Sequence, residues 1–156
     1  MSSLSELHQA VAELAAAIAG QALDPALQAR LNAEFGAESA LARRLRAACD
    51  QGVADGLLCQ REAAGIRYGR VFKPEPALGE FSVDVVDMQD IAGPHHVHPQ
   101  GEIDLVMPVD ADARFDGHAA GWVVYGPGSA HRPTVRGGRA RVLYLLPRGL
   151  IEFSPA

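Results

Sequence analysis

The chain has 156 residues, a length that suits a single domain with its own hydrophobic core. Its formal net charge is -5 at pH 7 and its isoelectric point is near 5.6, which argues against a nucleic-acid-binding protein because such proteins normally carry a basic patch. We see no secretory leader and no apolar run long enough to span a bilayer, so we expect no membrane partner. The two cysteines, Cys49 and Cys59, form no C-x-x-C pair, and we expect a cytoplasmic protein with reduced thiols.

Three amphipathic helices are predicted in the first third of the chain. Apolar residues spaced three and four apart predict the first helix over residues 3–18, with Ser3 as the N-cap of an S-x-x-E capping box. The second helix, over residues 24–35, begins with Asp24 and a proline in its first turn. The third spans about residues 38–51 and ends at a glycine. We expect these helices to serve packing or dimerisation and to carry no site.

From residue 53 onward the pattern is typical of β-structure. Runs rich in valine, leucine, isoleucine and aromatic residues alternate with turn-forming clusters. The runs are "GLLCQRE", "GIRYGRVF", "FSVDVVDM", "EIDLVMPV", "GWVVYGPG" and "RARVLYLLP". We therefore predict a mainly β protein, a sandwich or barrel over residues 53–156 that follows a helical segment over residues 1–52.

Histidines are concentrated in the segment "GPHHVHPQGEIDL". His96 and His98 are two residues apart, which places both side chains on one face of a strand. Glu102 follows a "PQG" turn and opens the next strand, and His131 follows a glycine-proline turn from which it can reach the first pair and begin a further strand. Three imidazoles and a carboxylate suit Fe(II), Mn(II), Ni(II), Cu(II) or Zn(II) with open positions left over, so we predict a catalytic metal site.

Neighbouring residues have weaker claims to a role. His95 faces away from His96 and is expected at the surface or outside the metal's ligands. Asp104 shares the strand face of Glu102, so it is predicted either to assist catalysis through a hydrogen bond or to be an ordinary buried aspartate. Tyr125 closes a strand and is expected to pack in the core.

The spacing of the predicted ligands resembles the two metal-binding motifs of the cupin superfamily. The first motif is matched by His96, His98 and Glu102, and the second by Gly128 and His131. The resemblance covers the predicted β-domain. It implies a small antiparallel double-stranded β-helix, or jelly-roll barrel, that holds a divalent first-row transition metal inside.

Four longer segments resemble the small bacterial cupins that include 4-hydroxylaminobenzoate lyase, which also carry a helical N-terminal segment. These segments are "GRVFKP", "GPHHVHPQGEIDL", "FDGHAAGWVVYGPGSAHRPTV" and "LYLLPRGLIEF". The resemblance implies an enzyme of aromatic degradation that converts 4-hydroxylaminobenzoate to 3,4-dihydroxybenzoate with release of ammonia. Glu102 would then either remain a ligand or detach and carry protons. A cupin-type dioxygenase on a small aromatic substrate, a non-catalytic cupin that binds a small ligand, and a sugar isomerase or epimerase remain as alternatives.

An aromatic carboxylate substrate calls for an arginine, because a planar guanidinium binds a carboxylate through two hydrogen bonds. Arg67 and Arg70 lie three residues apart on one predicted strand, so only one of them can point into the barrel, and the sequence does not show which. Barrels with an apolar helical appendage often pair, and we therefore expect a homodimer or larger homo-oligomer.

Overall fold

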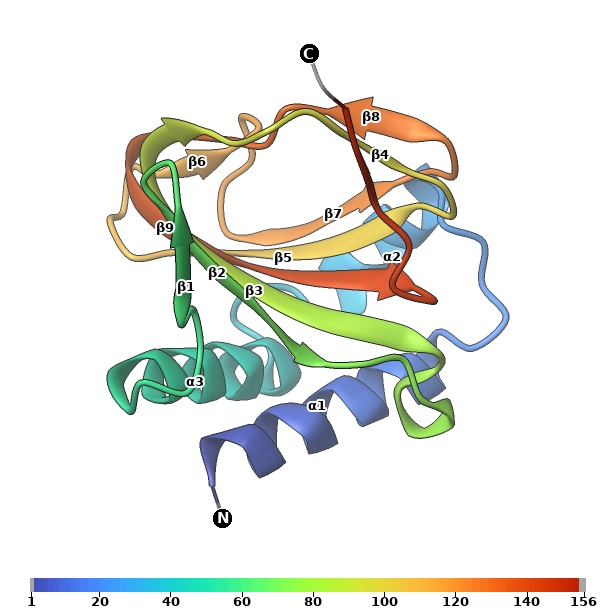
Figure 1. The fold of residues 1–156 in the computed structure, drawn as a ribbon. Coiled ribbons are helices and arrows are strands. Elements are labelled where there is room, and N and C mark those ends of the chain that lie inside the picture. The colour runs from blue at the N-terminus through green and yellow to red at the C-terminus, as the bar shows by residue number, and fades with distance from the viewer. Residues whose placement is uncertain (1, 155–156) are drawn as a thin grey trace.

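A computed structural model describes residues 2–154, in which three helices cover one face of a two-sheet barrel (Figure 1). The helices are α1 (Ser3–Ala17), α2 (Pro25–Glu34) and α3 (Ala40–Ala54). Each begins at a residue whose side-chain oxygen accepts a hydrogen bond from a backbone N–H in the first turn. The first cap is Ser2 and not the predicted Ser3, because the Ser2 backbone is extended whereas Ser3 is already helical.

Two antiparallel sheets form the barrel. The large sheet follows the strand order β1-β2-β3-β9-β5-β7, with β6 also paired to β9, and the small sheet follows β10-β4-β8. The strands are β1 (Arg61–Ala63), β2 (Ile66–Phe72), β3 (Phe81–Ala92), β4 (His96–His98), β5 (Glu102–Pro108), β6 (Arg114–Phe115), β7 (Gly121–Tyr125), β8 (Ser129–His131), β9 (Thr134–Pro147) and β10 (Glu152–Phe153), and a short 3-10 helix, η1 (Pro76–Leu78), precedes β3. Figure 1 shows the small sheet lying across the large one, with α1 and α3 on the far side of the large sheet.

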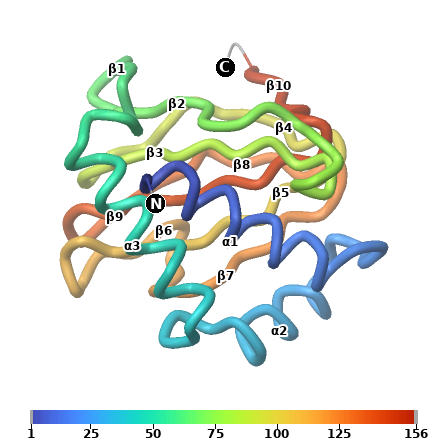
Figure 2. Tube along the Cα trace, turned by 90° about the horizontal axis from the view of Figure 1, so that it is seen from below, coloured from blue at the N-terminus to red at the C-terminus, as the bar shows by residue number. Residues whose placement is uncertain are grey.

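Both faces of the large sheet are buried, each in its own apolar cluster. On the outer face, Leu105 and Leu143 pack with helix residues such as Leu14. On the inner face, Val106 and Val142 line the barrel interior. Viewed from below, the three helices lie across the outer face of the large sheet, on the side opposite the barrel interior (Figure 2). The mainly β fold with N-terminal helices is thus confirmed, while the division at residue 52 stays a prediction.

Two predicted strand positions are wrong. Only the end of the run "GLLCQRE" enters a strand, because the chain leaves α3 through a loop that buries Leu58 and Cys59 beneath the sheet edge. His131 does not begin the following strand but ends the short strand β8, because β8 must align with β4 before the chain continues into β9. The first difference arises because an apolar run is buried within a loop, and the second because a strand of three residues is too short to show a period.

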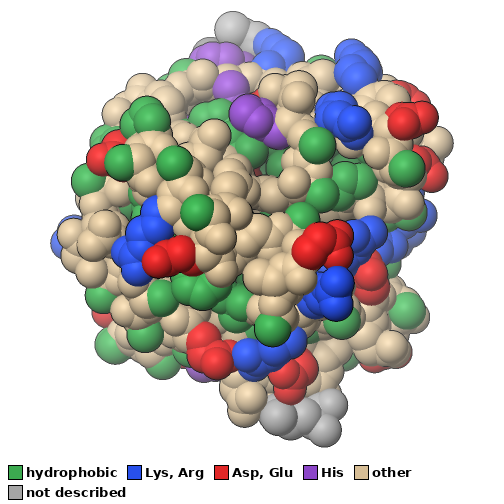
Figure 3. Space-filling view, turned by 180° about the vertical axis from the view of Figure 1, so that it is seen from behind, with side chains coloured by type: hydrophobic (Ala, Val, Ile, Leu, Met, Phe, Trp, Pro, Cys, Tyr) green, Lys and Arg blue, Asp and Glu red, His purple; other side chains and the backbone are tan. Residues whose placement is uncertain are grey.

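The surface is mixed in charge. On the face shown in Figure 3, positively and negatively charged side chains lie interspersed with apolar ones. None of the described helices combines the length and the apolar character needed to cross a membrane.

Candidate metal centre

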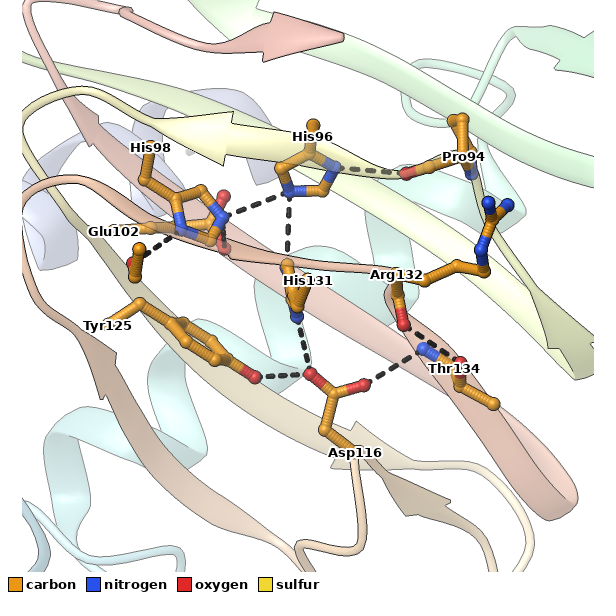
Figure 4. Close-up of polar contacts among 10 residues, drawn as sticks. Pro94, His96, His98, Glu102, Asp116, Tyr125, His131, Arg132 and Thr134 are labelled. Atoms are coloured by element: carbon orange, nitrogen blue, oxygen red, sulfur yellow. Dashed lines mark hydrogen bonds and ion pairs between the residues drawn. The ribbon is translucent and has the colours of Figure 1, made fainter. Parts of the chain in front are cut away.

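The four predicted metal ligands meet inside the barrel (Figure 4). His96 and His98 come from β4, Glu102 from the start of β5 and His131 from the end of β8. Pairing of β4 with β8 sets His96 opposite His131. The nitrogen and oxygen atoms that these residues offer all lie within 4.8 Å of one another. His98 and Glu102 are completely buried, His96 is 2% exposed and the His131 side chain is 12% exposed, so most of the centre is screened from bulk water.

Each of the three imidazoles has a hydrogen-bond partner for Nδ1 that lies outside the centre. The Nδ1 pairs are His96 with the Pro94 carbonyl oxygen at 3.2 Å, His98 with Ser129 Oγ at 2.9 Å, and His131 with Asp116 Oδ2 at 2.6 Å. A carbonyl and a carboxylate only accept, so His96 and His131 carry their proton on Nδ1. Their Nε2 lone pairs then point into the centre, which is the orientation that a metal requires.

The inner atoms lie close enough together to share one cation. His96 Nε2 is 2.9 Å from His98 Nε2 and 3.1 Å from His131 Nε2. Glu102 Oε2 lies 3.3 Å from His98 Nε2, and neither oxygen of this buried carboxylate has a hydrogen-bond partner among the described residues. An unpaired buried carboxylate that faces several lone pairs is costly unless a positive charge is present. Three imidazole nitrogens and one carboxylate oxygen therefore fit a divalent first-row metal.

The protonation of His96 agrees with a ligand role. Burial lowers the pKa of the His96 imidazole to about 4, although the charge of Glu102 opposes this shift. The ring is consequently neutral at pH 7, and its Nε2 lone pair is available. Metal binding by this cluster nevertheless remains a prediction.

Asp104 lies on the same inner strand face as Glu102, as the sequence predicts, and it is completely buried. Neither of its oxygens has a hydrogen-bond partner among the described residues. Burial, together with the negative charge of Glu102, raises the pKa of Asp104 well above its usual range. A buried carboxyl whose ionised form is disfavoured thus lies beside the candidate ligand.

Sequence reasoning missed Asp116. Its Oδ2 accepts hydrogen bonds from His131 Nδ1 and, at 2.5 Å, from the Tyr125 hydroxyl, and its Oδ1 accepts one from Thr134 N at 3.0 Å (Figure 4). Burial alone would raise the pKa of Asp116, but the hydrogen bonds from His131 and Tyr125 outweigh it and hold this pKa below its usual range. Because Asp116 sits in a turn-like "FDG" segment, its sequence context indicates only an exposed loop.

A pocket of about 660 Å³ opens beside the cluster and contacts it through His96. Arg70 lines this pocket, and its guanidinium is fixed by Asp84, with an Nε–Oδ1 distance of 2.9 Å. The same guanidinium also donates to the Gly149 carbonyl oxygen. Arg67 pairs opposite Asp87 on the other face of the sheet and lines a separate, smaller hollow. Of the two predicted arginines, only Arg70 is therefore on the side of the metal cluster.

Two aromatic side chains also line the pocket. Phe153 is 63% exposed, and its ring lies edge-to-face against His96, with 5.6 Å between ring centroids. Tyr68 lies on the same inner strand face as Arg70 and is likewise exposed. Large apolar side chains left open to solvent beside a buried polar cluster are typical of a ligand-binding site.

An antiparallel two-sheet barrel with three histidines and a glutamate in its interior defines the protein as a cupin, here with an N-terminal helical segment. The chain belongs to the 4-hydroxylaminobenzoate lyase family, because the family model described as "PnbB: 4-hydroxylaminobenzoate lyase" matches residues 9–153. The 4-hydroxylaminobenzoate lyase of Nocardioides sp. (strain LMS-CY) is 34% identical over 82% of this chain and 81% of its own length. The enzyme of the same name from Pseudomonas putida is 30% identical over 80% of each chain.

Solved structures show a more distant similarity. An RmlC-like cupin protein from Ralstonia eutropha JMP134 has 17% identity and a TM-score of 0.44, covering 58% of this chain and 60% of that one. A chain from the crystal structures of the DMSP lyases RdDddP and RnDddQII has 15% identity and a TM-score of 0.44, covering 97% of both chains.

Proposed function

We propose that the protein is a metal-dependent lyase that converts 4-hydroxylaminobenzoate to 3,4-dihydroxybenzoate and ammonia. The observation that carries the proposal is the buried cluster of three imidazoles and one unpaired carboxylate, in a chain that belongs to a family named for this activity. The names of the two curated relatives support the same substrate. The overall change consumes one water and needs no oxidant, because the nitrogen leaves at the oxidation level of ammonia.

The metal would be held by His96, His98, Glu102 and His131. When bound, a divalent cation supplies Lewis-acid polarisation of a substrate oxygen in a site from which bulk water is largely excluded. The protein holds the three imidazoles in the required tautomer and orientation through partners outside the cluster. No rotation of these rings is then needed when the metal binds.

Arg70 would bind the carboxylate of the substrate. Asp84 and the Gly149 carbonyl oxygen already fix its guanidinium, so little side-chain entropy is lost when a second carboxylate arrives. Tyr68 and Phe153 supply apolar walls for the aromatic ring between Arg70 and the cluster. Arg67, on the opposite face, has no part in this proposal.

Cleavage of the N–O bond requires a proton on the departing hydroxide. Asp104 is buried next to Glu102 and its pKa is raised, and both features support a role as the group that supplies this proton. Water then adds to the ring carbon beside the nitrogen, and hydrolysis of the resulting imine releases ammonia. Glu102 would accept the proton that the incoming water gives up.

The test is a product assay without oxygen. Metal-loaded protein is incubated anaerobically with 4-hydroxylaminobenzoate, and 3,4-dihydroxybenzoate and ammonia are measured together. The proposal expects the two products in a 1:1 ratio. A reaction that starts only when oxygen is admitted would indicate a dioxygenase, and protein that holds metal but turns over no substrate would contradict the assignment.

A further inference from the structure

The three imidazoles of the cluster differ in what holds them. The Nδ1 of His96 donates to a backbone carbonyl and that of His98 pairs with a serine hydroxyl, both of which are neutral. Only His131 donates to a charged group, the carboxylate of Asp116, and its distance of 2.6 Å is the shortest of the three. A charge-assisted hydrogen bond of this kind is stronger than a neutral one and draws the Nδ1 proton away from the ring. The Nε2 of His131 is therefore the most electron-rich of the three inner nitrogens.

We propose that Asp116 is a positioning residue that sets the metal affinity of the centre through the Nδ1–H of His131. This inference rests on the proposed metal site. The Asp116 carboxylate is itself fixed by the Tyr125 hydroxyl and by the backbone N–H of Thr134, so the acceptor cannot swing away from the ring. The Tyr125 ring packs on the ring of His131, with 4.5 Å between centroids, and adds steric support to the same orientation.

A purely structural role for Asp116 has to be separated from this one. Asp116 has φ 49, in the left-handed region, and its backbone N–H donates to the Thr134 carbonyl oxygen, so it also holds a turn against β9. Asp116→Asn is the suitable variant, because asparagine tolerates a left-handed backbone better than most residues. The amide has one oxygen and one NH2 group, so it can satisfy either Thr134 or the pair of His131 and Tyr125, and in both cases the negative charge is lost.

The chain offers two matched controls. Asp90 also has a left-handed backbone, with φ 43, and its carboxylate accepts from the backbone N–H groups of Gly137 and Gly138. Among residues 2–154 it has no hydrogen bond to an imidazole, so Asp90→Asn tests the loss of a carboxylate that only supports a turn. Tyr125→Phe removes the other side-chain hydrogen bond to Asp116 Oδ2 and leaves the charge at His131 in place.

The experiment measures Co²⁺ binding to metal-free protein by competition with a chelating indicator, with visible absorption as a second readout. We expect Asp116→Asn to raise the Co²⁺ dissociation constant by about 10- to 100-fold. Asp90→Asn should leave it near the wild-type value, whereas Tyr125→Phe, which keeps the charge at His131 but loses one hydrogen bond to Asp116, should raise it by less than Asp116→Asn does. In metal-free protein, nitrogen-15 NMR should place the His131 proton on Nδ1 in the wild type, and this preference should weaken in Asp116→Asn.

The outcomes distinguish a failure of the metal site from a failure of the role assigned to Asp116. Wild-type protein that binds no Co²⁺ would refute the metal site and this inference with it. Wild-type and Asp116→Asn proteins that bind Co²⁺ equally well would refute the inference alone. An equal loss of affinity in Asp116→Asn and Tyr125→Phe would also overturn it, because the loss would then follow from the hydrogen bond of the Tyr125 hydroxyl and not from the charge at His131.

Discussion

Replacing Glu102 by glutamine should have opposite effects on the metal-free and the metal-loaded protein. In the absence of metal, the Glu102 carboxylate is completely buried, has no hydrogen-bond partner among the described residues, and lies beside the Asp104 carboxyl. A glutamine of the same shape removes this charge, and its NH2 group can donate to His98 Nε2, now 3.3 Å from the carboxylate oxygen. We therefore expect the metal-free variant to be more stable than the wild type.

The size of the effect follows from the cost of burying a polar group without a partner, about 1–3 kcal/mol in proteins. For a domain of this size, each kcal/mol shifts the melting temperature by about 2–4 °C, so the metal-free variant should melt about 2–12 °C higher. With metal, the wild type gains about 4.1 kcal/mol at a free metal concentration of about 1,000 times its dissociation constant, which exceeds the variant's advantage, and most of this gain should be absent in the variant.

Thermal unfolding followed by circular dichroism, once with a chelator and once with Co²⁺, measures both effects. The order of melting temperatures should reverse between the two conditions. A metal-free Glu102→Gln protein that melts below the wild type would refute the reasoning, because Glu102 would then have a stabilising partner in the metal-free state. Glu102→Leu is the matched control, since it removes the charge without providing a donor for His98.

Three further predictions concern the pocket and the sheet. In steady-state assays, Arg70→Gln should raise KM for 4-hydroxylaminobenzoate by about 10- to 150-fold, which corresponds to the loss of one hydrogen bond to a charged group. Arg67→Gln, on the opposite face of the sheet, should leave KM unchanged. Phe153→Ala should raise KM with little change in kcat, and Leu150→Ala, which removes an exposed side chain outside the pocket, should change neither. Burial alone would raise the pKa of Asp87, but the hydrogen bonds and charges of its two arginine partners outweigh burial and lower this pKa. The stability that Asp87 contributes should therefore be present above about pH 4 and be lost as the pH falls through the lowered pKa. Urea unfolding between pH 3 and 7 should show a flatter pH dependence for Asp87→Asn, and parallel curves for the two proteins would contradict this.

The sequence was sufficient to predict the metal cluster because its geometry is mostly local. The two-residue spacing of His96 and His98 determines their shared face whatever the strand packs against. Glu102 follows within one tight turn, so its distance from His98 is limited by the length of the chain. His131 was predicted from a motif, and its position opposite His96 depends on the pairing of β4 with β8.

What the sequence could not determine depends on packing between distant segments. Alternation in β2 separates Arg67 from Arg70, but both faces of the large sheet are buried, one under helices and one inside the barrel, so the pattern does not show which face lines the site. Asp116 becomes a partner of His131 only because the turn that contains it packs against the start of β9. Neither residue pattern nor spacing carries that information.

The central claim is a non-oxidative conversion in which water provides the new oxygen atoms. The most direct test is mass spectrometry of the 3,4-dihydroxybenzoate formed in ¹⁸O-labelled water and, separately, under ¹⁸O-labelled oxygen gas. Addition of water to the ring followed by imine hydrolysis predicts that both phenolic oxygens come from water and neither from the gas. Label from oxygen gas in the product would contradict the account, and a product with only one oxygen from water would show that the hydroxylamino oxygen is retained and would refute the water-addition step.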